Sequence, residues 1–118
     1  MADTLERRCE RLRQPVTELV ATSMSAAYRT LDLPDLLKAI ATVRGILAED
    51  PSGLPDGPFL AWLPTALRNL DNMRDAVVAG DAAKSYAILT DKNDGFIRLT
   101  VGCAGYPGWD PVGTSATA

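Results

Sequence analysis

The chain has 118 residues, which suits one domain of ordinary size, and 47% of them are hydrophobic. Its net charge is −3, and it contains no histidine, so the commonest general base and the commonest transition-metal ligand are both missing. The weak negative charge also argues against a nucleic-acid-binding protein, which needs a basic face.

Residues 3–30 are predicted to form the first helix. Pro15 interrupts this segment, and we expect a long helix that is kinked or broken there. Arginines and acids alternate at helical spacing near its start and predict a solvent-exposed face with salt bridges. Apolar or small residues recur at steps of four and three, as on one face of a helix: Leu5, Cys9, Leu12, Val16, Leu19, Ser23, Ala26 and Thr30.

The second helix is predicted to begin at Asp32-Leu33-Pro34-Asp35, where a capping Asp, an early proline and an acid stand together. Its apolar stripe continues to Leu47. Residues 49–58 are rich in proline and glycine and predict a loop. A third helix is expected over residues 59–79, with Pro64 as an alternative starting point.

Gly80 and Asp81 are typical of a helix end followed at once by a helix cap, and so predict two antiparallel neighbours. The fourth helix is expected over residues 82–102. Gly95 and the polar run before it weaken the helix prediction at its centre. The four segments predict an all-α fold, an antiparallel up-down-up-down four-helix bundle. Residues 1–111 would form this single domain, and residues 112–118 a disordered tail.

Two cysteines are present, one near each end of this predicted bundle. In an antiparallel bundle the start of the first helix lies beside the end of the fourth, so Cys9 and Cys103 are predicted to be close. The sequence leaves two alternatives open. The pair forms a disulfide, or both cysteines are buried free thiols in a reducing compartment.

We assign no catalytic, metal-binding or cofactor-binding residues from the motifs. Residues 91–97 resemble the start of an EF-hand loop, but the glycine comes one residue early and the downstream glutamate is missing. Asp71 and Asp75 share a helix face, with Arg68 and Arg74 nearby, and predict solvated ion pairs.

The segment from Phe59 to Leu70, the link 79–82 and Cys103 resemble the second half of the cytochrome c-prime and soluble b-type cytochrome bundles. In the c-type members of that family, a Cys-x-x-Cys-His motif attaches the haem and ligates its iron. Cys103 matches the first cysteine, whereas Tyr106 stands at the second and Pro107 at the histidine. The resemblance therefore implies the bundle fold with a degenerate haem site and no cofactor. It also implies a protein that is often dimeric through its first helices.

These observations predict a non-enzymatic helical bundle that acts as a ligand-binding, sensing or protein-interaction module. A second copy of the chain, another protein or a small apolar ligand is the expected partner. Two alternatives are a thiol-based redox protein that uses Cys103 with Cys9, and a purely structural dimerising bundle.

The chain begins with charged residues and contains no apolar run of the roughly 20 residues that cross a membrane. We expect a cytoplasmic protein with no membrane span, or a periplasmic one if a signal peptide has been removed.

Overall fold

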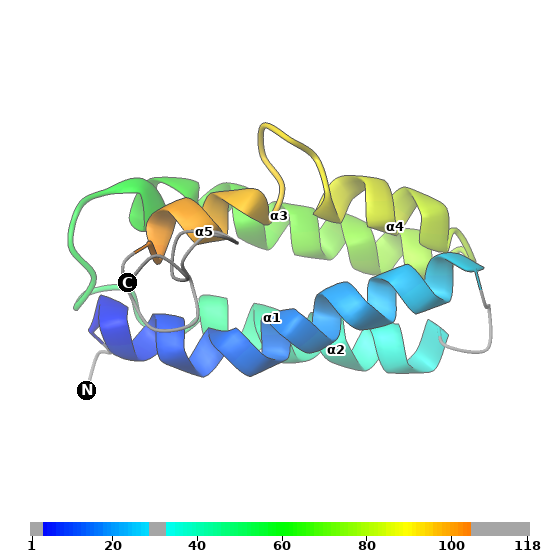
Figure 1. Cartoon of the computed structure of the whole chain (residues 1–118), viewed down its shortest axis with the longest axis horizontal. Coiled ribbons are helices and arrows are strands. Elements are labelled where there is room, and N and C mark those ends of the chain that lie inside the picture. Colours follow the sequence, from blue (N-terminus) through cyan, green and yellow to red (C-terminus); the bar gives the residue numbers. More distant parts are fainter. Residues whose placement is uncertain (1–3, 29–32, 105–118) are drawn as a thin grey trace, which may run out of the picture.

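The computed structural model describes residues 4–28 and 33–104. Their regular structure consists of helices, with no strand in these ranges (Figure 1). This confirms the predicted all-α class. The predicted tail at residues 112–118 lies outside the described residues, as does Thr30. The helices are α1 (Leu5–Tyr28), α2 (Leu33–Leu47), α3 (Pro58–Val78), α4 (Ala82–Leu89) and α5 (Ile97–Gly102).

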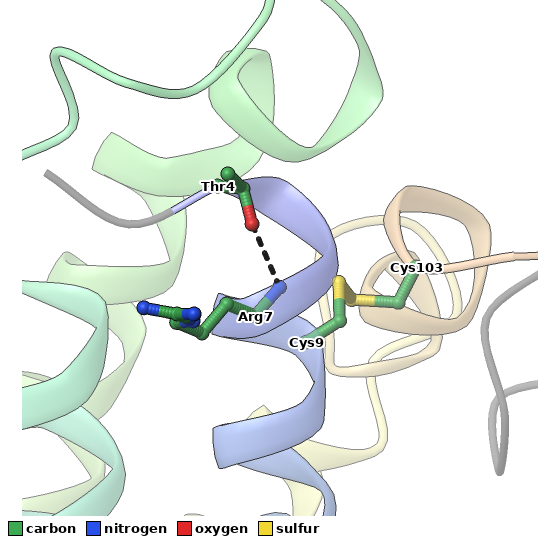
Figure 2. Close-up of a disulfide and its surroundings, with 4 residues drawn as sticks. All are labelled: Thr4, Arg7, Cys9 and Cys103. Carbon is green, nitrogen blue, oxygen red and sulfur yellow. Dashed lines mark hydrogen bonds between the residues drawn. A yellow bond between two sulfur atoms is a disulfide. The ribbon is translucent and has the colours of Figure 1, made fainter.

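Helix α1 starts at a threonine cap and continues through its proline. The Thr4 hydroxyl accepts a hydrogen bond from the Arg7 N–H at 3.2 Å, which satisfies one free donor of the first turn (Figure 2). A break at Pro15 is wrong, because one helix spans Leu5–Tyr28. Buried side chains before and after the proline, including Leu12 and Leu19, still share one face, and their burial stabilises the unbroken helix.

One arginine near the start of α1 is buried, contrary to the predicted solvent-exposed face. Arg8 is 1% exposed and donates to the main-chain oxygens of Glu49 at 3.2 Å and Asp50 at 2.7 Å. These carbonyls follow the end of α2, where a cation is electrostatically favourable. The expected surface pairing does occur between Glu10 and Arg13, at 3.1 Å.

Helix α3 begins at Pro58, directly after Gly57, and passes through Pro64. The alternative start at Pro64 is therefore wrong, and Pro58 occupies the first turn, where no N–H partner is needed. At the other end, Gly80 has φ of 82°, a left-handed conformation that glycine adopts without a Cβ clash. The Asp81 carboxylate then accepts from the Lys84 N–H at 3.0 Å and caps α4.

The predicted fourth helix is divided into α4 and α5 by a loop of residues 90–96 (Figure 1). Asp91 Oδ1 accepts hydrogen bonds from the N–H groups of Asn93 and Asp94, each at 2.8 Å. Such local bonds compete with helical ones and stabilise the turn. The Phe96 N–H returns to the Leu89 oxygen at 3.0 Å and closes the loop.

Helix α1 packs against α2 and α4, whereas α3 packs against α2, α4 and α5. Leucine, valine and isoleucine dominate the core between them, as their apolar stripes predict. Trp62 of α3 meets Phe96 edge to face, with ring centroids 5.2 Å apart. Gly102 of α5 lies on the Phe59 backbone, where an added Cβ would come within 3.0 Å.

None of the described helices combines the length and the apolarity that crossing a lipid bilayer demands.

Candidate functional site

The structure joins Cys9 of α1 to Cys103, the residue after α5, in a disulfide (Figure 2). Their Cα atoms are 5.8 Å apart, and 94 positions separate them in the sequence. Both side chains are fully buried. The sequence left open a disulfide or two free thiols, and the structure has the disulfide.

The disulfide anchors a short helix, α5, at its C-terminal end. Helix α5 has six residues, too few to be stable alone, and it packs on α3, with Gly102 against Phe59. The bond to Cys9 adds a covalent link to α1, on the other side of the core. The disulfide consequently gives α5 a second anchor, in addition to its packing on α3.

Only one of the three degenerate haem-site positions is described by the structure. The sulfur of Cys103 is bonded to Cys9, so this thiol is already used. Tyr106 and Pro107 lie outside the described residues. In residues 4–28 and 33–104, no group of three His, Cys, Asp or Glu side chains comes together as a metal site would require.

The polar run before Gly95, residues 91–94, has a structural role. Hydrogen bonds from the main-chain N–H groups of Asp94 and Asn93 hold the pKa of Asp91 below its usual value, because they favour the charged carboxylate. The Asp94 carbonyl accepts from Trp62 Nε1 and from Asn69 Nδ2, each at 2.9 Å. These bonds fix the loop on α3.

The two carboxylates on α3 make surface ion pairs. Asp71 is paired with Arg44 of α2, with Nε and Oδ1 2.7 Å apart, and this hydrogen bond lowers the pKa of Asp71. Asp75 lies 3.4 Å from Arg74. The sequence predicts solvated pairs here but not Arg44, because a partner on another helix leaves no mark in the local spacing.

The C-terminal half of α1 carries the clearest surface feature. Its last ten residues, 19–28, contain no charged side chain, whereas the first fourteen residues of α1 contain seven. Val20, Met24 and Tyr28 follow one another at steps of four and are exposed by 37%, 49% and 89%. We call these three residues the α1 stripe. Exposed apolar side chains gathered on one helix face are typical of contact surfaces.

Sequence reasoning missed the α1 stripe, although its signal is present. The apolar spacing that marks the buried face of α1 runs through Leu19, Ser23 and Ala26, and a second apolar row at 20, 24 and 28 lies beside it. A helix that is apolar on more than one face needs more than one partner.

The chain matches no protein-family model, no curated protein and no solved structure.

Proposed function

We propose that this protein is a non-enzymatic helical bundle that acts as a protein-interaction module and associates with a second copy of itself through the α1 stripe. The observation that supports this proposal is the α1 stripe, which lies on a stretch of α1 without charged residues and leaves Met24 and Tyr28 exposed. Interface cores are depleted in charge and enriched in Tyr and Met.

The charge distribution indicates where a second copy would dock with the least repulsion. Each molecule has a net charge of −3, so two copies repel one another over most of their surfaces. The α1 stripe lies on the ten-residue stretch without charges, where this repulsion is weakest. A two-fold axis would bring the stripe onto its own copy, so each exposed side chain would meet an apolar surface.

We further propose that the architecture is an antiparallel four-helix bundle whose fourth member is α4 followed by α5. The neighbours of each helix support this arrangement, because α1 and α3 each pack against α2 and α4. In this proposal the chain is a cytochrome c-prime-like bundle without haem ligation. The Cys9–Cys103 pair then has the role of a structural staple.

The disulfide also supports a compartment for the protein. Structural disulfides persist mainly in oxidising environments. We therefore propose that the protein resides in the periplasm or a comparable oxidising compartment, and not in the cytoplasm. Cell fractionation, followed by detection of the disulfide-bonded chain in each fraction, tests this.

Light scattering on the wild-type protein and on two variants tests the self-association. Met24→Asp places a charge in the stripe of both copies, and Val101→Asp is a matched control at similar exposure, 50% against 49%, on α5. Burying a methionine side chain contributes about 1.5 to 3 kcal/mol to the free energy of association. With two copies of Met24 at the interface, we expect Met24→Asp to raise the dissociation constant about 100-fold or more.

We expect Val101→Asp to leave the molar mass unchanged. A wild-type protein that remains monomeric at millimolar concentration would overturn the proposal, and so would equal weakening by both variants.

A further inference from the structure

A small open pocket lies between the first half of α3 and the segment that runs from the 90–96 loop into α5. Its volume is about 240 Å³. Sites for drug-sized ligands usually measure roughly 300 to 1,000 Å³, so this pocket suits a molecule smaller than a typical drug. On the α3 side it is lined by Pro58, Ala61, Trp62 and Thr65, and on the other side by Asp94 and Arg98.

The outer wall of this pocket is held in place by several contacts. Trp62 and Asn69 of α3 both donate to the Asp94 carbonyl, and Phe96 packs edge to face on Trp62. Arg98 Nε donates to the Asn93 carbonyl at 2.6 Å. The main chain of Asp94 is therefore held against α3, and Arg98 is held on the loop through its Nε. These contacts leave the Asp94 carboxylate and the terminal guanidinium nitrogens of Arg98 unused.

The two charges that line this pocket are opposite, yet they are not paired. Neither Asp94 nor Arg98 forms an ion pair with another residue of the described ranges, and they do not pair with one another. A guanidinium has five N–H donors, and Arg98 uses the one on Nε, which leaves the Nη donors. Such a guanidinium binds a carboxylate with two parallel hydrogen bonds.

The geometry points to a binding site for a small zwitterion, a free amino acid, of which glycine is the simplest probe. Its carboxylate binds the Nη groups of Arg98, and its ammonium group binds the Asp94 carboxylate. The apolar wall of Pro58, Ala61 and Trp62 lies beside the side chain of the bound amino acid. This site is on different elements from the α1 stripe and does not depend on self-association.

Nuclear magnetic resonance on the full chain tests this inference. The indole N–H of Trp62 reports on the pocket, and Trp109→Phe identifies its signal, since the chain has two tryptophans. Free glycine is titrated against the protein, with acetate and methylammonium as half-ligands at matched ionic strength. Because exposed ion pairs are weak, we expect saturable shifts with a dissociation constant on the order of 1 mM for glycine. Each half-ligand should bind more weakly.

Three variants assign the charges. We expect Arg98→Gln to weaken glycine and acetate binding by at least about five-fold, and Asp94→Asn to weaken glycine but not acetate. Asp94→Asn keeps the main-chain carbonyl that anchors the loop. Arg68→Gln, an exposed arginine of α3 outside the pocket, is the matched control and should change nothing. Unchanged remaining signals verify the fold of each variant.

Three outcomes would overturn the inference. Shifts that rise linearly with concentration, or that are the same in Arg98→Gln, would mean that no site exists. Acetate binding as tightly as glycine would mean that the pocket binds carboxylates without recognising the ammonium group.

Discussion

Gly95 occupies a point in the 90–96 loop where a Cβ atom does not fit. An added Cβ would overlap the Asp91 carbonyl oxygen and would lie 2.6 Å from the Leu89 oxygen, both of them main-chain atoms. Gly45 of α2 is the natural control, because a Cβ there meets nothing within 4 Å.

We expect Gly95→Ala to destabilise the protein by about 1 to 3 kcal/mol, as overpacking does, since the loop must shift. Gly45→Ala should stabilise it by about 0.5 to 1 kcal/mol, because alanine favours the helix. Urea unfolding of both variants measures the two effects. Equal and small changes at both positions would contradict the packing described for Gly95.

Asp91 makes the loop sensitive to pH. Its pKa lies below the usual value of about 3.8, because the N–H groups of Asp94 and Asn93 donate to its carboxylate. A carboxyl group with a lowered folded pKa adds stability above its unfolded pKa and loses that contribution as the pH falls through the folded value.

We therefore expect Asp91→Asn to lower Tm at pH 7, with a difference from the wild type that shrinks as the pH is lowered from about 5 to about 2. Thermal unfolding followed by circular dichroism across this range measures it. A difference that is independent of pH would show that the charge on Asp91 has no part in holding the loop.

At the scale of the elements, α1 and α4 share a buried layer that contains two serines. They run in opposite directions and pack together (Figure 1). Their buried residues are spaced alike, so an antiparallel register places Ala26 by Ala82, Ser23 by Ser85 and Leu19 by Leu89. Neither Ser23 Oγ nor Ser85 Oγ has a hydrogen-bond partner among the described residues, although both side chains are fully buried.

A buried hydroxyl without a partner costs about 1 to 3 kcal/mol. We therefore expect Ser23→Ala and Ser85→Ala to be neutral or to stabilise the protein by up to about 1 kcal/mol, unlike most buried substitutions. Chemical denaturation of the two single variants and of the double variant measures this. A loss of stability in either single variant would mean that the hydroxyls are hydrogen-bonded in solution.

The helices themselves were predictable, because apolar spacing and end signals are local. The stripes ending at Leu47 and starting at Leu63, and the Gly80-Asp81 junction, correspond to the observed elements. The division of the fourth helix was not, since it depends on Trp62 and Asn69, which bind the loop from another helix. The burial of Arg8 depends likewise on carbonyls 41 and 42 positions away.

The functional sites also include some features that could be predicted from the sequence and others that could not. The closeness of Cys9 and Cys103 followed from the order of the helices, while the covalent bond between them did not, because spacing carries no information about oxidation. The alternative of a redox role for Cys103 stays a prediction. The pocket at Arg98 was not predictable, since it requires the loop to bring Asp94 back against α3.

At the scale of the whole molecule, the disulfide closes a loop of 94 positions. In the chain-entropy model, a bond across a loop of this length stabilises the folded state by about 4 to 5 kcal/mol. We expect the double variant Cys9→Ser with Cys103→Ser to be less stable by up to this amount, and to lose the hydrogen-exchange protection of α5 first.

Urea unfolding of the wild-type chain with and without reductant provides the comparison, and the double variant should not respond to reductant. Equal stability of the oxidised and reduced chains would contradict the view that the disulfide is a structural staple.

The central claim, self-association through the α1 stripe, is tested most directly by the methionine methyl signals. Met24 lies in the stripe at 49% exposure, whereas Met73 is fully buried in the core and is an internal control. With ¹³C-labelled methyl groups, the spectrum is recorded over a range of protein concentrations. The account predicts a saturable, concentration-dependent shift of the Met24 signal while that of Met73 stays fixed. A Met24 signal that does not change with concentration would contradict it.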